Sequence, residues 1–265
     1  MPYADINGTQ MFYESHGEGP ALVFAHGRGG SHLSWWRQVA VFQREYRCVT
    51  FDHRGWGLTP GSGGQPEPAT FVADLQALLD HLEINRATLV AQSMGGVTSL
   101  GFALAHPERV SGLLLADTTG GIGDPSVVSL LEDVHPPEDP LRRALSDGFI
   151  ESQPELTFLF GSIGRMNPPM PLSIVSDLFR NPAGPQASDL AGFVVPTLLV
   201  VGEEDRIFPP HVIEAAHRLI PGSRLEVVAG AAHSTHYEQA EIFNGLLAGF
   251  LADIGAGIAG VAADD

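Results

Sequence analysis

Residues 88–96 read Thr88-Leu-Val-Ala-Gln-Ser93-Met-Gly-Gly96, an apolar strand that runs directly into a serine, two glycines and the start of a helix. So sharp a strand-to-helix turn strains the backbone and pushes the serine Oγ out at the carboxyl end of the strand. It needs small residues two before and two after, here Ala91 and Gly95, although glycine is usual at the first position. We therefore predict Ser93 as a nucleophile and the N–H of Met94 as an oxyanion donor. A serine that only caps the helix is the alternative.

A serine nucleophile needs a base that is itself held by an acid. Asp205 lies a few residues past the apolar run 196–201, where parallel sheets place functional loops. Another strand-like run leads through Gly-Ala-Ala to His233. The sequence therefore predicts a triad in which His233 takes the proton of Ser93, while Asp205 fixes the imidazole tautomer and stabilises the imidazolium.

Two rivals to these assignments remain. Asp117 follows the strand-like run 112–116 and could orient the histidine from a different strand end. His236 competes with His233, but it lies where the last helix is expected to begin, which favours a residue of the surface or of the pocket rim.

A second oxyanion donor is predicted in the stretch His26-Gly-Arg-Gly-Gly30, which directly follows the apolar run 21–25. A glycine-rich loop lets a backbone N–H approach the substrate oxygen closely, and we assign that N–H to Arg28, with Gly27 beside it as a substrate contact. The phosphate-binding patterns G-x-G-x-x-G and Walker A are missing from the loop. The Arg28 side chain could pair with an acid of the loop 52–55 or meet a substrate carboxylate.

Short apolar runs alternate with helix-length segments along most of the chain. The strand-like runs are residues 2–6, 11–15, 21–25, 47–51, 87–91, 112–116, 196–201 and 224–228. The predicted helices are residues 34–43, 70–83, 94–106 and 211–219, with a last helix from about residue 236. Asn7-Gly8 between the first two runs predicts a hairpin. This alternation predicts an α/β fold with a parallel sheet covered on both faces.

The alternation breaks between Gly120 and Leu190, a stretch that holds 10 of the 20 prolines. We interpret residues 120–190 as an inserted helical lid, because a structureless loop of that length is unusual inside a compact domain. The core domain then comprises residues 1–119 and 191–252. The Gly- and Ala-rich residues 253–265 are expected to form a disordered tail.

Composition narrows the classes of partner. The 265 residues include 14 Lys and Arg against 31 Asp and Glu, which gives a net charge of −17. So acidic a surface repels phosphate backbones and anionic lipid, and we expect neither nucleic acid nor membrane as a partner. Cys48 is the single cysteine and the histidines show no ligand spacing, so we expect no metal site. The chain shows neither a secretory signal nor a spanning segment, which predicts a cytoplasmic protein of undetermined oligomeric state.

With these motifs in this order, the chain resembles the α/β-hydrolase superfamily over essentially its full length. The matching pieces are His26-Gly27, Asp52-His-Arg-Gly-Trp-Gly57, Ala91-Gln-Ser-Met-Gly-Gly96, Pro107-Glu-Arg-Val110, Gly202-Glu-Glu-Asp205 and Gly230-Ala-Ala-His233 followed by Glu238. Within the superfamily the chain is most similar to the small esterases and lactonases that include 3-oxoadipate enol-lactonases. The resemblance implies the α/β-hydrolase fold, a mostly parallel eight-stranded sheet with helices on both faces and a helical lid after the sixth strand. It also implies a Ser–His–Asp triad that works without a cofactor.

We therefore expect a cofactor-independent serine hydrolase that cleaves a small or medium ester or lactone through an acyl-enzyme at Ser93. The same triad could instead hydrolyse a C–C bond of a diketone or polyketide, or carry out perhydrolysis. A ligand-binding relative with incidental turnover is a further hypothesis. Trp56 and the lid residues Phe158 and Phe160 are the other candidate substrate contacts. The lid carries ten Asp and Glu against four Arg, which disfavours anionic substrates unless Arg28 turns inward.

Overall fold

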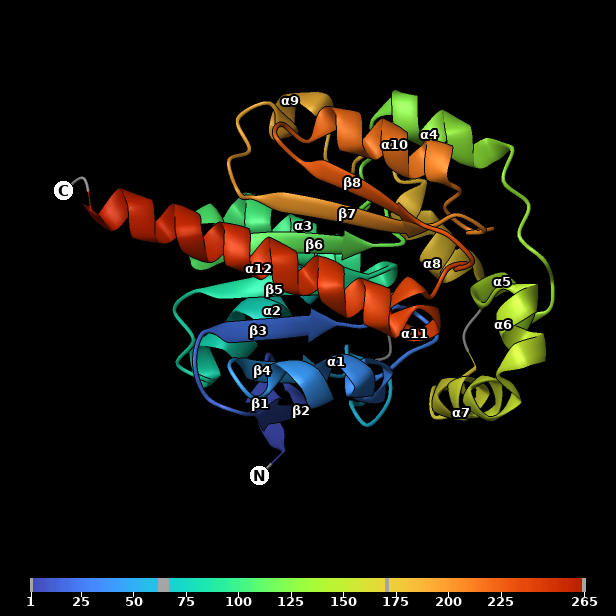
Figure 1. Ribbon diagram of the computed structural model, residues 1–265, viewed down its shortest axis with the longest axis horizontal. Coiled ribbons are helices and arrows are strands. Elements are labelled where there is room, and N and C mark those ends of the chain that lie inside the picture. Colours follow the sequence, from blue (N-terminus) through green and yellow to red (C-terminus); the bar gives the residue numbers. More distant parts are fainter. Residues whose placement is uncertain (1, 62–66, 170–171, 264–265) are drawn as a thin grey trace.

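The computed structural model describes residues 2–61, 67–169 and 172–263. It contains an eight-stranded sheet in the order β1-β2-β4-β3-β5-β6-β7-β8 (Figure 1). The strands are β1 (Tyr3–Ile6), β2 (Thr9–His16), β3 (Ala21–Ala25), β4 (Arg47–Phe51), β5 (Ala87–Gln92), β6 (Val110–Ala116), β7 (Thr197–Gly202) and β8 (Arg224–Val228). Each strand-like run of the sequence coincides with one of these strands to within two residues at either end.

The sheet is mostly parallel, as predicted. Only the pairings of β1 with β2 and of β2 with β4 are antiparallel. Asn7 and Gly8 have φ values of 49° and 77°, which the expected hairpin turn requires at both central positions. The parallel register sets Ala25 beside Ala91, and Ala116 beside both Gln92 and Val200. The loops that follow β3, β5, β6 and β7 therefore leave the sheet at one common edge.

Helices cover both faces of the sheet (Figure 1). Outside the segment between β6 and β7 they are η1 (His32–Trp35), α1 (Trp36–Phe42), α2 (Pro68–His81), α3 (Met94–Ala105), η2 (Pro107–Arg109), α10 (Pro210–Leu219), α11 (Thr235–Glu238) and α12 (Ala240–Ala263). Alternate residues of each buried strand point to opposite faces. On β3, Val23 packs in the core cluster that holds α2, α3 and α10, whereas Phe24 packs in the cluster that holds α1 and α12.

Short helices fill the segment between β6 and β7. In its described part they are α4 (Pro125–Glu132), α5 (Pro140–Ala144), α6 (Asp147–Ser152), α7 (Pro154–Gly164), α8 (Leu172–Phe179) and α9 (Ala187–Leu190). Proline occupies the first turn of α4, α5 and α7, where its missing N–H costs nothing. The prolines therefore start these helices, whereas elsewhere in a helix they would break it. In Figure 1, α5, α6 and α7 lie beyond the carboxyl ends of the strands.

Residues 253–263 are helical, so the expectation that the tail is disordered from residue 253 is wrong for this stretch. Helix α12 continues through this stretch to Ala263 and points away from the carboxyl edge of the sheet (Figure 1). No proline follows Ala240 to stop the helix, and alanine, which has the highest helix propensity, recurs among its glycines. Residues 264–265 lie outside the described part of the chain. Within that part, no helix is both long and apolar enough to span a bilayer.

Candidate active site

Ser93 lies on the tight turn between β5 and α3. Its φ of 50° and ψ of −118° are a strained backbone conformation for a residue with a side chain. The Ser93 N–H donates to the Ala116 carbonyl at 3.0 Å, which ties the turn to β6. A Cβ added at Gly95 would lie 2.2 Å from the Ala25 carbonyl oxygen, so only glycine lets α3 approach β3 this closely. Met94 begins α3, and its N–H therefore has no partner in the preceding turn of the helix.

The imidazole of His233 lies between Ser93 and Asp205. His233 Nε2 is 3.0 Å from Ser93 Oγ, and His233 Nδ1 is 2.9 Å from Asp205 Oδ2. The other carboxylate oxygen of Asp205 accepts from the N–H groups of Ile207 and Phe208 at 2.8 and 2.9 Å. These bonds fix the carboxylate, which holds the proton on Nδ1 and leaves Nε2 free to accept the serine proton. The structure thus brings together the three residues that the sequence predicts as a triad.

The charge environment of His233 favours a protonated imidazole. The side chain is 6% exposed, and burial alone lowers the pKa of its imidazole. The hydrogen bond and negative charge of Asp205, with the charges of Asp117 and Glu238, outweigh burial and raise that pKa above its ordinary value. The imidazolium that forms after proton transfer is therefore stabilised inside the site.

Asp117, the alternative acid, binds the histidine loop rather than the histidine. One carboxylate oxygen accepts from the Gly202 N–H at 3.1 Å and from the Thr235 hydroxyl at 2.6 Å, and the other accepts from the Thr235 N–H at 3.0 Å. Complete burial and the nearby negative charge of Asp205 raise the pKa of Asp117 to about 7. The structure therefore places Asp205, and not Asp117, on the ring of His233.

Two supporting residues were not assigned a role from the sequence. The Gln92 side chain donates to the His233 carbonyl at 2.7 Å and so fixes the backbone of the histidine itself. The buried Glu238 carboxylate accepts from the Ala232 N–H at 2.9 Å and from the Ser146 N–H at 2.7 Å, which joins the histidine loop to the inserted helices. The position of Glu238, five residues after the histidine, was visible in the sequence, but nothing local indicated what it bonds.

The glycine-rich loop after β3 packs directly against the serine turn. A Cβ added at Gly27 would lie 2.0 Å from Gln92 Oε1 and 3.0 Å from the Ser93 Cβ, so the backbone of this loop adjoins the serine. The indole N–H of Trp56 donates to the Arg28 carbonyl at 2.8 Å and holds the loop in place. Trp56 is 1% exposed and packs in the core, so through this bond it positions the loop; its predicted contact with substrate stays a prediction.

Asp52, the acid of the loop after β4, is bonded to His32. Asp52 accepts from the His32 N–H at 2.6 Å and lies 2.9 Å from the His32 ring. In the same loop, Arg54 pairs with Asp74 at 2.7 Å. Asp52 is therefore held by His32, and the use of the Arg28 side chain stays a prediction.

Phe158 and Phe160, the two aromatics of α7 predicted as substrate contacts, lie in different surroundings. Phe158 is 72% exposed, and the Arg165 guanidinium lies 5.6 Å from the centre of its ring, so this side chain faces solvent. Phe160 packs edge-on against Tyr237 at 5.1 Å in a small cluster of the inserted helices. This contact gives Phe160 a packing role among the helices between β6 and β7.

His236 is buried, which corrects the expectation of a surface or rim residue. It is 3% exposed and stacks on Trp35 with ring centroids 4.4 Å apart. Neither ring nitrogen has a hydrogen-bond partner among the described residues, and burial, followed by the charge of His233, lowers the pKa of His236 to about 3. His236 is therefore a neutral packing residue.

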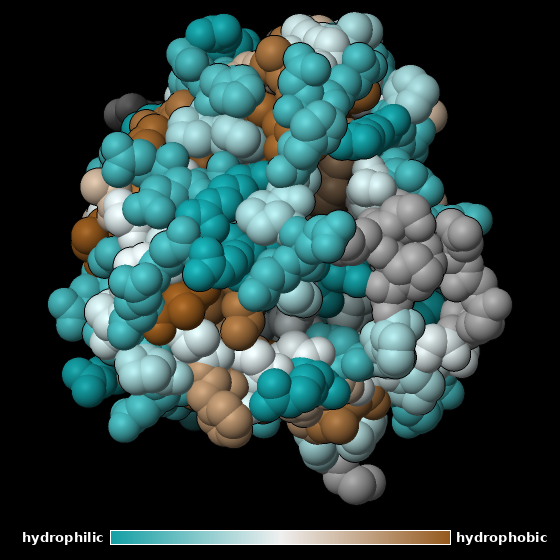
Figure 2. Space-filling view, turned by 90° about the vertical axis from the view of Figure 1, so that its right-hand side faces the viewer, coloured by the Kyte–Doolittle hydropathy of each residue, from teal (hydrophilic) through white to brown (hydrophobic). Residues whose placement is uncertain are grey.

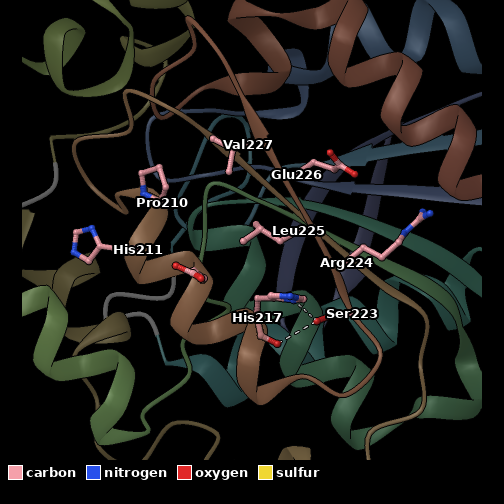
Figure 3. Close-up of a pocket in the computed structure, with 9 residues that line it drawn as sticks. Pro210, His211, His217, Ser223, Arg224, Leu225, Glu226 and Val227 are labelled. Atoms are coloured by element: carbon pink, nitrogen blue, oxygen red, sulfur yellow. Dashed lines mark hydrogen bonds between the residues drawn. The ribbon is translucent and has the colours of Figure 1, made fainter.

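Two further features bear on where a ligand could bind. Among the described residues, no group of three or more His, Cys, Asp or Glu could hold a metal ion. A hollow between α10 and β8, where His217 bonds Ser223 at 2.7 Å, has walls that include none of the triad residues (Figure 3). The carboxyl edge of the sheet faces the side shown in Figure 2, whose surface is largely hydrophilic. The triad therefore lies at the carboxyl edge of the sheet and not in this hollow.

Comparisons with known proteins agree with the fold. A model of the family described as the alpha/beta hydrolase fold matches residues 20–161 and 163–240. A putative 2-succinyl-6-hydroxy-2,4-cyclohexadiene-1-carboxylate synthase of Bacillus subtilis is 31% identical over 261 residues, covering 89% of this chain and 93% of that protein. The 3-oxoadipate enol-lactonase 2 of Acinetobacter baylyi is 29% identical over 233 residues, covering 85% and 86%. The crystal structure of an enol-lactonase from Burkholderia xenovorans superposes with a TM-score of 0.79 at 25% identity, covering 95% of this chain and 100% of that one.

Proposed function

This chain belongs to the α/β-hydrolase fold family, and we propose that it is a cofactor-independent serine hydrolase of small or medium esters or lactones. The observation that carries the proposal is the continuous chain of hydrogen bonds from Ser93 through His233 to Asp205. A serine that only capped a helix would not need a buried imidazole on its hydroxyl and a carboxylate behind it.

In the proposed first step, Ser93 Oγ attacks the carbonyl carbon of the substrate while His233 Nε2 takes the hydroxyl proton. Asp205 holds the imidazole and stabilises the imidazolium without itself becoming protonated. The negative charge that develops on the carbonyl oxygen is stabilised by the N–H groups of Arg28 and Met94. His233 then gives its proton to the leaving alkoxide, and the acyl group stays on Ser93.

Water completes the cycle in the proposed second step. His233 takes a proton from water, the resulting hydroxide attacks the acyl carbon, and Ser93 recovers its proton as the acid leaves. Hydrolysis of an ester or a lactone differs here only in whether the alcohol departs or stays joined to the acid. The similarity to the 3-oxoadipate enol-lactonase of Acinetobacter baylyi supports this bond class for our protein.

Steady-state hydrolysis tests the proposal. The purified chain is assayed on 4-nitrophenyl esters of graded acyl length, on aliphatic lactones and on a 1,3-diketone, beside Ser93→Ala. We expect turnover of esters or lactones, and a loss of about a thousandfold or more in Ser93→Ala with an unchanged circular dichroism spectrum. Equal turnover by the wild type and Ser93→Ala would overturn the nucleophile, and turnover of the diketone alone would overturn the bond class.

A further inference from the structure

Residues 27–30 form a tight turn shortly after β3, here called the oxyanion turn because it contains the backbone N–H proposed as an oxyanion donor. The Gly30 N–H donates to the Gly27 carbonyl at 2.9 Å and closes the turn. Arg28 occupies the second position, so its N–H takes no part in that bond. Because Gly27 packs against Ser93, any shift of the turn moves the Arg28 N–H relative to the serine hydroxyl.

Two buried side chains of the core hold the first half of the oxyanion turn. The His26 ring donates from Nδ1 to the Gly27 carbonyl at 2.7 Å, since a carbonyl can only accept. The Trp56 indole N–H donates to the Arg28 carbonyl at 2.8 Å. These bonds fix the carbonyls of the first two residues of the turn, whereas the carbonyl of the last residue, Gly30, is bound by a different element.

The Gly30 carbonyl is bound by Asn167, which follows α7 in the segment between β6 and β7. Asn167 Nδ2 donates to this carbonyl at 3.0 Å, and Asn167 Oδ1 accepts from the Gly57 N–H at 2.8 Å. The two partners determine the orientation of the amide, because the reverse orientation would set donor against donor and acceptor against acceptor. One side chain therefore joins the oxyanion turn to the loop after β4.

The end of α7 places Asn167 beside the oxyanion turn. The Asn167 N–H donates to the Gly164 carbonyl at 3.2 Å, so the backbone turns directly after the helix. A Cβ added at Gly164 would lie 3.5 Å from the Gly29 carbonyl oxygen, which is van der Waals contact. The helix end and the oxyanion turn are thus neighbours, and Asn167 is positioned between them by its own backbone.

Other bonds fasten the segment between β6 and β7 to α11, which follows the histidine of the triad. The Ser146 N–H donates to the Glu238 carboxylate at 2.7 Å, and the Tyr237 hydroxyl donates to the Leu156 carbonyl at 2.8 Å. Removal of the Asn167 side chain would therefore leave this segment attached to the core. Its effect is expected at the oxyanion turn.

We propose that Asn167 is a positioning residue for the serine reaction: by binding the Gly30 carbonyl, it holds the oxyanion turn where the Arg28 N–H stabilises the charge on the substrate oxygen. This inference rests on the proposed function and deepens it, since it gives the segment between β6 and β7 a part in stabilising the oxyanion. A donor is effective only when it is held at about 3 Å from the developing charge. Because that charge appears only as the serine attacks, the Asn167 bond acts on the transition state more than on bound substrate.

The test compares two changes at position 167. Asn167→Asp keeps the shape of the side chain and the acceptor for the Gly57 N–H, but it sets a carboxylate oxygen against the Gly30 carbonyl. Asn167→Ala removes both bonds. We expect kcat for the 4-nitrophenyl ester that the wild type hydrolyses best to fall about tenfold in each variant, with KM within about twofold of the wild-type value.

Inhibition by phenylboronic acid separates the placement of the donor from a general effect on the fold. The serine oxygen bonds to boron, the serine proton passes to His233, and the resulting tetrahedral borate carries its negative charge beside the oxyanion donors. We expect the Ki of phenylboronic acid to rise in both Asn167 variants by the factor by which kcat falls. Thermal melts establish folding, and Asn167→Asp carries the test if the alanine variant does not fold.

Asn181 provides a matched control in the same segment. Its Oδ1 accepts from the Ala183 N–H at 2.9 Å, a bond that involves no residue of the oxyanion turn. Asn181→Asp and Asn181→Ala make the same changes of charge and size, and we expect them to keep the wild-type kcat and Ki. The proposal would be overturned by a wild-type kcat in either folded Asn167 variant, by a loss of kcat without a rise in Ki, or by equal losses at position 181.

Failure of this proposal is distinguishable from failure of the proposed function. If only the role of Asn167 is wrong, hydrolysis still requires Ser93 while the Asn167 variants behave as the wild type does. If the proposed function is wrong, Ser93→Ala hydrolyses the esters as well as the wild type does, and phenylboronic acid inhibits neither protein.

Discussion

The Asp117 carboxylate accepts both the N–H and the hydroxyl of Thr235, at 3.0 and 2.6 Å. Thr235 lies two residues beyond the histidine of the triad, so a buried acid at the end of β6 determines where that histidine loop begins its helix. The acid that touches the imidazole comes from the next strand, β7. Two carboxylates therefore serve one histidine, one by direct contact and the other through the backbone that carries it.

Replacing the two acids one at a time separates these roles. In Asp205→Asn the imidazole loses its charged partner, and we expect turnover to fall by about a thousandfold or more with the fold retained. In Asp117→Asn an amide N–H must face the N–H of Thr235 or that of Gly202, so we expect a loss of about 1–3 kcal/mol in stability and a much smaller loss of turnover. Ester hydrolysis and thermal melts on both variants check this. A larger loss of turnover in Asp117→Asn than in Asp205→Asn would make Asp117 the acid of the triad.

The pH dependence follows from the raised pKa of His233. The imidazole must be neutral to accept the serine proton, so kcat/KM is expected to fall as the pH drops through the pKa of His233, which lies above the ordinary histidine value. Above about pH 7, where Asp117 itself ionises, Asp117→Asn removes one of the negative charges that raise the pKa of His233. The acid limb of the pH profile should therefore move to lower pH in that variant, and a limb that stays in place or moves upward would refute the electrostatic role of Asp117.

Glycine is required at position 27 by the packing of the loop against Ser93. In Gly27→Ala the new methyl group would lie 2.0 Å from Gln92 Oε1, so the loop or the Gln92 side chain must move and the oxyanion donor moves with it. We expect kcat to fall by about a hundredfold, which is the scale of losing one oxyanion donor. Gly29→Ala is the matched control, because nothing lies within 4 Å of its added Cβ. Equal kcat values for the two variants would show that the close approach has no role.

Trp56 is expected to act through the loop that it holds. Trp56→Phe keeps much of the packing but removes the bond to the Arg28 carbonyl, so we expect lower stability and a lower kcat for ester hydrolysis. The control is Trp36→Phe, since Trp36 is 41% exposed and belongs to the surface of α1. Melting temperatures and kcat values of the two variants test this. Identical effects would show that the bond from Trp56 to the loop has no role in catalysis.

The sequence predicted the strands and the serine turn because their signals are local. A strand buried on both faces is a continuous apolar run, as in β5 and β7, and the turn at Ser93 demands small residues at fixed positions around it. The order of serine, acid and histidine could likewise be read along the chain. These features do not depend on which distant segments meet.

What the sequence left open or predicted wrongly concerns contacts between distant segments or the continuation of a helix. Asp117 and Asp205 both follow strands that end at the same edge, and only the tertiary structure distinguishes the one that reaches His233. The exposure of Phe158 depends on how α7 is rotated, which a short apolar stretch does not specify. The tail was expected to be disordered from its glycine content, but without proline the helix continued to Ala263.

Labelling with a fluorophosphonate tests most directly whether Ser93 is an activated hydroxyl. The reagent phosphonylates a serine whose proton is removed by a positioned base, with loss of fluoride, and intact-mass spectrometry with peptide mapping locates the adduct. We expect one adduct per chain on Ser93, none on Ser93→Ala, and much slower labelling of His233→Gln. A folded wild-type protein that takes up no label, or that takes it up at another residue, would contradict the account.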